Sequence, residues 1–453
     1  MNSSVQEKVV HHLRHALEVS PNHLPSFVAL SEFYLKYDNF SEVSKLLDNT
    51  SHSEQSIEVL FIKAKLYNRL KDYDKASQAI TICTESDSTT VEQLKLAVEI
   101  EQNRENDAGV IEHLENIIDK DPLDGNSHFL LAEKIVTADQ YDKKRLLLEI
   151  SVSLLPHNPA PLVLLGEHLL SGEKAMPDGT ITQTPNYSEA EKNLLSAIEI
   201  DPMLEKAHYL RGKIMLQLGK KKEARAQFKK CTKDNEIQYL ANIEMGKALM
   251  NESRFHDAKP YFEKAHKVQK EKYFPVFKLG IISLKDEKHT EARVFLEDSM
   301  NRAENELSMM EKQSEDFLKG NRFNQARRVL KNINEVKKNL SVIHLLIQQI
   351  VMKLSDKFTF FHLDRSLEYN PHNSDSLYEK GRQFVDSDKE SATNYWQRSV
   401  EADWFNWKSH FELARINFDS KKFDLARTHI EIANDLIPEH APVINLMMMI
   451  DKN

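Results

Sequence analysis

Glycine and proline are scarce in this chain: its 453 residues include eleven glycines and fourteen prolines. Soluble proteins average about 7% glycine and 5% proline, and proteins built from many short strands need both residues for their turns. The shortage therefore argues against a sheet protein. Charged residues make up 29% of the chain and hydrophobic residues 40%, a mixture typical of amphipathic helices, so the composition favours an all-α fold.

Long apolar runs and a positive net charge are also missing. No run approaches the roughly 18 residues of a membrane-spanning helix, and residues 1–21 lack the apolar core of a secretory signal. The formal net charge of −9 provides no overall field that attracts nucleic acid or an anionic membrane. We therefore expect a cytoplasmic protein with no membrane span and no nucleic-acid ligand.

One short pattern recurs with a fixed period. The stretch RFHDAKPYFEKA, residues 254–265, has echoes whose central alanines are each 34 residues apart: Ala190, Ala224, Ala258, Ala292 and Ala326. Within each copy, apolar residues recur at i, i+3, i+4 and i+7 in two stretches separated by a polar turn, which predicts a helical hairpin. A glycine or alanine on the first helix, such as Gly246, predicts close packing against the second helix.

These features resemble the tetratricopeptide repeat family, which pairs Leu-Gly on the first helix with Ala-x3-Phe and Pro on the second. The resemblance covers nearly the whole chain. It implies a right-handed α-solenoid of stacked antiparallel helix pairs. Twelve copies start near the following residues: Leu24, Ile57, Val91, Gly125, Pro159, Glu205, Tyr239, Tyr273, Leu307, Leu340, Ser374 and Trp407.

The spacing of the copies predicts four segments. Residues 1–23 form an N-terminal half-repeat helix, 24–306 a first sub-array, 307–438 a second sub-array, and 439–453 a C-terminal capping helix. Within the first sub-array, one copy contains an insertion at 173–186 between its two helices. We interpret this insertion as a polar surface loop.

Two other stretches, 296–319 and 324–354, lack proline where copies should end. There the second helix of one copy is expected to continue into the first helix of the next.

The two cysteines, Cys83 and Cys231, occupy the same place in the repeat, where other copies have small residues such as Ala197 and Ala265. They lie four copies apart. Because packed helices are about 8–10 Å apart, that separation is several times the Cα spacing that a disulfide allows. We predict two reduced, buried thiols.

Motifs for catalysis are not apparent. The chain has no glycine-rich phosphate loop, no Cys-x-x-Cys pair and no His-Glu-x-x-His motif. His11 and His15 share a helix face beside His12, but they lack a carboxylate or thiolate partner. We predict no enzymatic activity, no cofactor and no metal site.

A lysine cluster lacks interleaved aromatic residues, so we interpret it as a solvated face rather than as an anion site. It comprises Lys220, Lys221, Lys222, Lys229, Lys230 and Lys233.

The family resemblance implies that the first helix of each copy lines a concave groove that binds protein segments. Copies 205–285 are the expected main site. At the positions of their first helices that face the groove, they combine lysines with apolar side chains and have no acid. Carboxylates beside apolar anchors would then be the expected ligand. The alternative is that these charges only pair with neighbours. The candidate groove residues are Lys206, Tyr209, Lys213, Ile243, Lys247, Phe274, Phe277, Arg382, Phe411 and Arg415.

The expected function is a non-catalytic scaffold that binds a peptide segment or protein partner. The alternative is a regulatory or substrate-docking arm of an enzyme, as a separate subunit or part of a longer chain. Residues 441–451 are apolar nearly all round, which favours a contact of the C-terminal end with a partner. We expect self-association there through Met447 and Ile450, or contact with a further domain.

Overall fold

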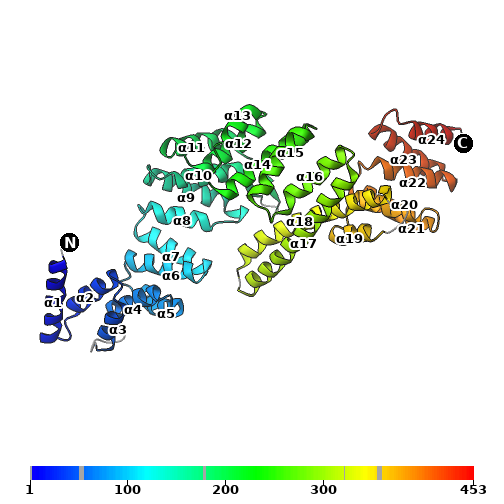
Figure 1. The fold of residues 1–453 in the computed structure, drawn as a ribbon. Helices are drawn as coiled ribbons and strands as arrows, with labels where there is room; N and C mark the ends of the chain where they lie inside the picture. Colours follow the sequence, from blue (N-terminus) through cyan, green and yellow to red (C-terminus); the bar gives the residue numbers. More distant parts are fainter. Residues whose placement is uncertain (1–2, 50–55, 177–179, 321, 355–359, 453) are drawn as a thin grey trace. The chain divides into compact units, whose positions relative to one another are not determined.

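The computed structural model describes residues 3–49, 56–176, 180–320, 322–354 and 360–452. Throughout these ranges the chain is helical except for turns, loops and two strands of three residues each, which confirms the all-α prediction. Consecutive helices pack in pairs (Figure 1). Among the described residues, no helix combines the length and apolar character needed to span a bilayer.

The chain divides into two compact units, Met1–Ile214 and Met215–Asn453, and α12 (Glu205–Gln217) crosses the division. The predicted boundary at 306/307 lies inside the second unit and stays a prediction, as does the handedness of the repeat. The first unit contains α1 (Ser3–Val19), α2 (Leu24–Lys36), α3 (Phe40–Asp48), α4 (Ile57–Arg69), α5 (Tyr73–Thr84), α6 (Val91–Asn103), α7 (Asp107–Lys120), α8 (Gly125–Lys134), the 3-10 turn η1 (Ala138–Gln140), α9 (Tyr141–Leu154), α10 (Pro159–Ser171) and α11 (Tyr187–Ile200).

The second unit continues with helices of more variable length. They are α13 (Lys221–Phe228), α14 (Asn235–Asn251), α15 (Phe255–Val268), α16 (Tyr273–Lys285), α17 (His289–Lys319), α18 (Phe323–Leu354), α19 (Phe361–Tyr369), α20 (Ser374–Phe384), α21 (Lys389–Ala402), α22 (Trp407–Asp419), α23 (Phe423–Leu436) and α24 (Ala441–Asp451). The two longest, α17 and α18, have 31 and 32 residues. Each joins two repeat copies in one helix, as the missing prolines predicted.

Close packing inside the pairs depends on the small residue of the first helix. A Cβ added at Gly246 would lie 2.6 Å from Cζ of Phe262, and one added at Gly381 would lie 2.4 Å from Nε1 of Trp396. Neither position has room for a side chain. The predicted role of these glycines is confirmed.

The turn inside the pair uses the left-handed backbone conformation at one fixed position. Lys71 (φ 62°) and Ser253 (φ 60°) adopt it, as does Gly219 (φ 73°) in the equivalent turn. The next amide then reaches back five residues, as in the 2.9 Å bond from Asp72 N to Tyr67 O. This geometry closes the first helix as a Schellman-type cap does.

The small position near the end of the second helix ties the pair together. Ser151 Oγ donates to Gly125 O at 2.9 Å, and Ser399 Oγ donates to Ser374 O at 2.8 Å. The thiol of Cys83 holds the same position, with Sγ 3.5 Å from Ile57 O. Burial raises the pKa of Cys83 to about 11. Both cysteines are buried and not disulfide-bonded, as predicted.

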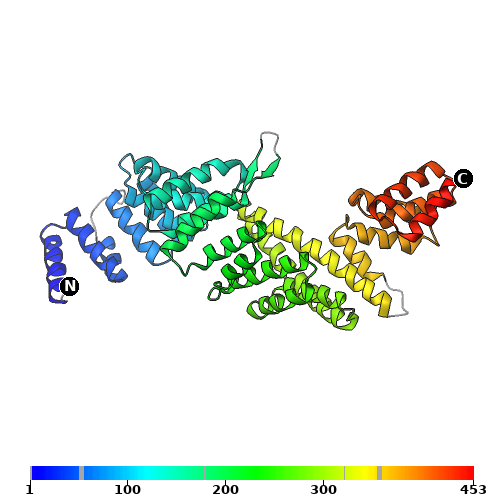
Figure 2. The ribbon, with the colours of Figure 1, turned by 90° about the horizontal axis from the view of Figure 1, so that it is seen from above.

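The insertion at 173–186, predicted to be a polar surface loop, contains a short β-hairpin. Strands β1 (Glu173–Ala175) and β2 (Ile181–Gln183) pair antiparallel, with Lys174 opposite Thr182, and the hairpin projects beyond the helices around it (Figure 2). Gly172 (φ 52°) directly precedes β1. A Cβ added to Gly172 would lie 2.4 Å from the Thr184 carbonyl carbon. Residues 177–179 of the insertion lie outside the described residues.

The C-terminal helix α24 lies within the predicted capping segment 439–453 but has a different exposed face from the one predicted. Ile450 is only 1% exposed and packs with Val443 and Leu446 in a core cluster that includes α23. The prediction that Ile450 lies on an exposed associating surface is therefore corrected: its face of α24 covers the last helix pair. Met447 is partly buried against the same cluster, and the exposed side chains are Met448 (57%) and Met449 (51%).

Candidate partner-binding pocket

A pocket of about 530 Å³ lies among α14, α16, α17 and α18 in the second unit. We call it the four-helix pocket. Three of the predicted groove residues, Ile243, Lys247 and Phe274, line it together. The other residues that line it are Glu236, Tyr239, Leu240, Glu244, Gln269, Lys272, Tyr273, Glu306, Met310, Asn332, Glu335 and Val336.

Aromatic side chains form the rigid part of this pocket. The rings of Phe274 and the predicted Phe277 meet edge to face, with centroids 6.4 Å apart, and Phe277 is buried in the core behind. Asn339 Nδ2 donates to the Tyr273 hydroxyl at 2.8 Å. Burial raises the pKa of both Tyr239 and Tyr273 far above the usual tyrosine value. These tyrosines therefore stay neutral, which suits contact with an apolar group.

Two lysines lie over the aromatic side chains. The Nζ of Lys247 is 5.0 Å from the centroid of Phe274 and 3.7 Å from Glu244 Oε1. The Nζ of Lys278 is 4.8 Å from the Phe274 centroid and 4.5 Å from that of Phe277. Burial, followed by the charge of Lys247, lowers the pKa of Lys278 to about 8. Lys278 does not itself line the pocket, but its Nζ lies beside Phe274, which does. Sequence reasoning missed Lys278, although it follows Phe277 directly.

The pocket also carries acids, which corrects the prediction of an acid-free site. Glu236 and Glu244 lie on α14, while Glu306 comes from α17 and Glu335 from α18. Lys272 Nζ pairs with Glu306 Oε1 at 2.8 Å. The groove-facing positions of the first helices do not include Glu306 and Glu335, because the former lies where α17 continues past the usual helix end and the latter lies on the second-helix part of α18. A ligand therefore meets both signs of charge.

Three further predicted residues lie on the part of α12 that belongs to the first unit. Lys206 Nζ pairs with Glu167 Oε1 at 3.0 Å, and Lys213 Nζ lies 5.8 Å from the centroid of the Tyr209 ring. Tyr209 itself is buried. The expected main site at 205–285 is thus divided between the two units, and only its second half forms the four-helix pocket.

The C-terminal candidates have partners of their own. Arg382 pairs with Glu379 at 3.3 Å, and Arg415 pairs with Glu412 at 2.7 Å. Phe411 packs against the core cluster of α22, α23 and α24. For these arginines, the structure favours the alternative in which groove charges pair with neighbours.

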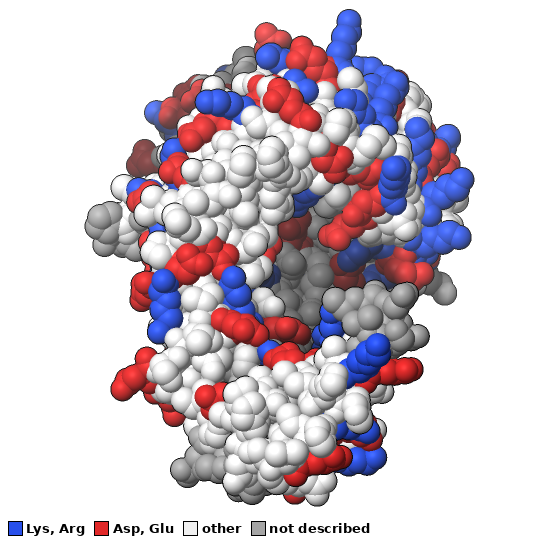
Figure 3. All heavy atoms as spheres, turned by 90° about the vertical axis from the view of Figure 1, so that its left-hand side faces the viewer, with Lys and Arg blue, Asp and Glu red and all other residues white. Residues whose placement is uncertain are grey.

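Acids on the first helices near the N-terminus also have partners. Lys65 Nζ bridges Glu32 Oε1 at 2.6 Å and Glu92 Oε1 at 2.9 Å. Asn68 Nδ2 donates to Glu99 Oε1 at 2.9 Å. Glu32, Glu92 and Glu99 therefore bind side chains of neighbouring copies. Lys/Arg and Asp/Glu side chains are interspersed across the face of the molecule drawn in Figure 3.

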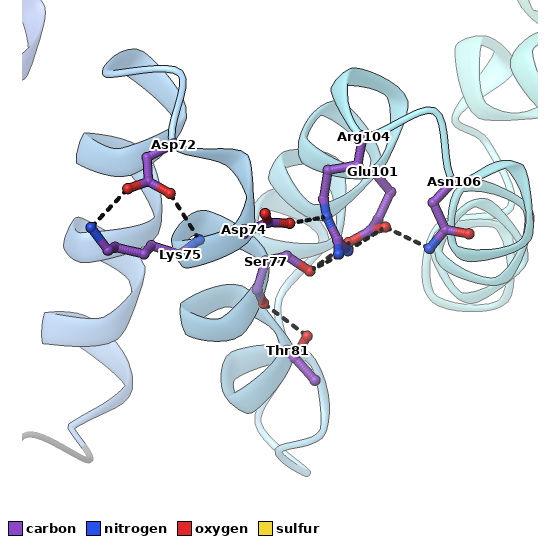
Figure 4. Close-up of polar contacts among 8 residues, drawn as sticks. All are labelled: Asp72, Asp74, Lys75, Ser77, Thr81, Glu101, Arg104 and Asn106. Atoms are coloured by element: carbon purple, nitrogen blue, oxygen red, sulfur yellow. Dashed lines mark hydrogen bonds and ion pairs between the residues drawn. The ribbon is translucent and has the colours of Figure 1, made fainter. Parts of the chain in front are cut away.

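A buried polar network replaces apolar packing in the copy at 91–124. The carboxylate of Glu101 (residue 4% exposed) accepts bonds from Ser77 Oγ at 2.7 Å, Asn106 Nδ2 at 2.6 Å and Arg104 Nη1 at 3.0 Å (Figure 4). Burial alone would raise the pKa of Glu101, but these bonds and the charge of Arg104 lower it. The network joins α5, α6 and α7, so its role is structural.

The histidines singled out in the sequence, His11, His12 and His15, are exposed on α1. In the described ranges there is no group of three or more His, Cys, Asp or Glu side chains that could hold a metal ion.

Successive helix pairs that share one small-residue interface and one turn geometry define a helical repeat protein. A family model described as tetratricopeptide repeat matches residues 57–90 and 205–233, which are two of the predicted copies. The chain therefore carries tetratricopeptide repeats at these two places, and helix pairs of the same architecture repeat along its described part. No curated protein matches it.

Several solved structures are similar at low identity. A chain of the APC/C hetero-tetramer Cut9–Hcn1 is 12% identical, with 99% of this chain and 94% of that chain covered and a TM-score of 0.38. A repeat protein from Cytophaga hutchinsonii is 14% identical over 56% and 99%, with a TM-score of 0.42. Yeast Tom70 is 14% identical over 99% and 92%, with a TM-score of 0.34. These scores add nothing to the family assignment.

Proposed function

We propose that this protein is a non-catalytic scaffold that binds a segment of a partner protein in the four-helix pocket. Proteins of this repeat family commonly mediate protein–protein interactions. The observation that carries the proposal is that Ile243, Lys247 and Phe274 line one pocket with a rigid aromatic floor. Pockets with apolar walls and a few charged groups are the usual sites for anchoring side chains.

The charges define the ligand that this pocket would accept. An apolar or aromatic anchor fits against Phe274 and Met310, and a carboxylate fits near Lys247 and Lys278. A basic group fits near Glu335, the acid contributed by α18. The sequence predicted carboxylates beside apolar anchors, and the acids of the pocket add a basic group to that ligand. The buried thiols are compatible with the cytoplasmic location that we also propose.

The test is a peptide selection followed by quantitative binding. Peptides selected from a random display library on the intact chain are titrated against Phe274→Ala, Lys247→Glu and the control Lys389→Glu. Lys389 is exposed at the start of α21 and makes the same charge change outside the pocket. We expect Kd to rise about tenfold or more for the first two variants, since each removes a central anchor, and to stay unchanged for the control.

Circular dichroism checks that the variants keep the helical content of the wild type. Selected peptides that bind the Phe274 and Lys247 variants as tightly as the wild type would overturn the proposal. So would an equal loss of affinity in Lys389→Glu, because that result would mean non-specific charge attraction.

A further inference from the structure

The opposite flank of α14 carries a second concavity. Two adjoining cavities of about 550 and 430 Å³ lie between α13 and α15 and share Arg225, Tyr261 and Lys264. We call them together the basic trough. Its lining residues on α14 include Ala241 and Met245, whereas the four-helix pocket uses Ile243 and Lys247. An offset of two residues turns a helix by about 200°, so the two sites face opposite ways.

The trough exists because α13 is unusually short. It has 8 residues, against 14 in the equivalent helices α11 and α15. After α13 ends, Asp234 accepts bonds from the amides of Glu236 at 2.8 Å and Ile237 at 3.0 Å. This cap starts α14 early, so that α14 reaches 17 residues. The last turns that a full-length second helix would supply are absent, and the flank of α14 stays open.

Cations line both sides of the opening. Arg225 and Lys229 are spaced i, i+4 at the end of α13, and Lys264 and Lys267 are spaced i, i+3 on α15. Such spacings place each pair on one face of its helix. Within the described part of the chain, none of these four side chains forms an ion pair with a carboxylate, and no acid lines the larger cavity.

The acids near the trough gather at its other end and are already paired. Glu252 forms ion pairs with Lys221 and, at 3.4 Å, with Arg254. Arg254 also binds Asp257 at 2.6 Å. The charge of the larger cavity is therefore positive and locally uncompensated, although the chain as a whole is acidic.

An aromatic ring lies where the two cavities join. Arg225 Cζ is 6.0 Å and Lys264 Nζ is 5.8 Å from the centroid of Tyr261. Phe228 and Met245 form a nearly buried floor beneath. The lysine cluster was interpreted as a solvated face because it lacks interleaved aromatic residues, but α15 places Tyr261 in the same cavity as Lys229. The concavity thus offers apolar contact as well as charge.

We propose that the basic trough binds an acidic peptide segment of a partner protein, with an apolar side chain against Tyr261. The cations form two rows along two helices, which matches carboxylates distributed along a chain better than one multiply charged group. Three of the four are lysines, which act as point charges rather than as bidentate clamps. A single tyrosine does not provide the succession of stacking surfaces that single-stranded nucleic acid uses. This site is independent of the four-helix pocket.

The probe is a fluorescein-labelled peptide of aspartate and glutamate with two leucines, titrated by anisotropy against the intact chain. The double variant Lys264→Glu/Lys267→Glu reverses one row of cations. The double variant Lys220→Glu/Lys230→Glu makes the same change of charge in the neighbouring sequence but outside the lining of the trough. We expect Kd to rise about tenfold or more in the first variant and about twofold at most in the second.

Further titrations test which chemical features of the ligand the binding requires. A neutral peptide with asparagine and glutamine in place of the acids should not bind, and higher salt should weaken the acidic peptide. Phe274→Ala should leave this binding unchanged, so failure here and failure of the proposed function are distinguishable. The proposal is overturned if the acidic peptide does not bind, if both double variants lose affinity equally, or if a single-stranded oligonucleotide binds more tightly through the same lysines.

Discussion

At the scale of single residues, Lys278 makes the binding account sensitive to pH. Burial and the nearby charge of Lys247 lower its pKa to about 8. A carboxylate in the four-helix pocket is attracted while Lys278 is protonated, so affinity should be full below that pKa and fall as the pH rises through it. Lys278→Met should remove this dependence while keeping the packing on Phe274. Isothermal titration of a selected peptide from about pH 6.5 to 9.5 tests it, and an identical slope in Lys278→Met would contradict the assignment.

Glu101 should matter for stability far more than its exposed neighbour in the same network. Glu101→Ala removes the acceptor for Ser77, Arg104 and Asn106 in a buried setting, and we expect a loss of about 1–3 kcal/mol in the free energy of unfolding. Asp74→Ala removes only an exposed contact to Arg104 at 3.3 Å and should cost about 0.5 kcal/mol or less. Urea denaturation compares the two, and equal losses would show that the Glu101 network contributes little.

A buried histidine pair predicts how the second unit responds to acid. His410 Nδ1 lies 3.0 Å from His429 Nδ1, and His410 Nε2 lies 3.1 Å from Trp404 O. Because a carbonyl only accepts, His410 donates from Nε2 and accepts at Nδ1 from His429. Burial, with a smaller contribution from the neighbouring His410, lowers the pKa of His429 to about 4.

The sign of the effect follows from that lowered pKa. The pair stabilises the fold fully above the unfolded pKa of about 6.5 and loses this contribution as the pH falls toward 4. In His429→Gln the amide donates in place of Nδ1–H, so its melting temperature should fall less between about pH 7.5 and 5 than that of the wild type. A steeper fall in the variant would refute this account of the pair.

At the scale of elements, the turn inside each helix pair gives a matched test. Gly219 and Ser253 hold the same left-handed position, and a Cβ at Gly219 would meet nothing within 4 Å. Gly219→Ala should therefore cost about 1 kcal/mol through backbone conformation alone, and Ser253→Gly should gain about 0.5–1 kcal/mol. Thermal unfolding measures both. Shifts of the same sign would mean that side-chain contacts, not φ, dominate there.

Elements differ in how far the sequence predicts them. The period of 34 residues locates the helix pairs because each pair repeats one small-residue contact, as at Gly246. The absence of proline where copies should end predicts the continuous helices α17 and α18. The approach of Glu306 and Glu335 to the pocket could not be predicted, because Glu306 lies where α17 continues past its usual end and Glu335 lies on a second helix, which was not expected to line the groove. The shortness of α13 was also missed, because the cap at Asp234 competes with the repeat phase.

At the scale of the whole molecule, self-association through α24 stays a prediction, but the residues expected to make the contact change. Ile450 is buried, and Met448 and Met449 carry the exposed apolar surface. If the end associates, Met448→Lys/Met449→Lys should shift the chain to a monomer in sedimentation velocity, while Ile450→Lys should lower the melting temperature because it places a charge in the core. A wild-type chain that sediments as a monomer at high concentration would contradict the idea.

The central claim is that a partner segment binds among α14, α16, α17 and α18. The most direct measurement uses a selected peptide whose apolar anchor is replaced by a benzophenone side chain, cross-linked by light and mapped by mass spectrometry. The account predicts cross-links to Ile243, Phe274, Met310 or Val336, and their loss when unlabelled peptide competes. Cross-links confined to the basic trough, to the first unit or to α24 would contradict it.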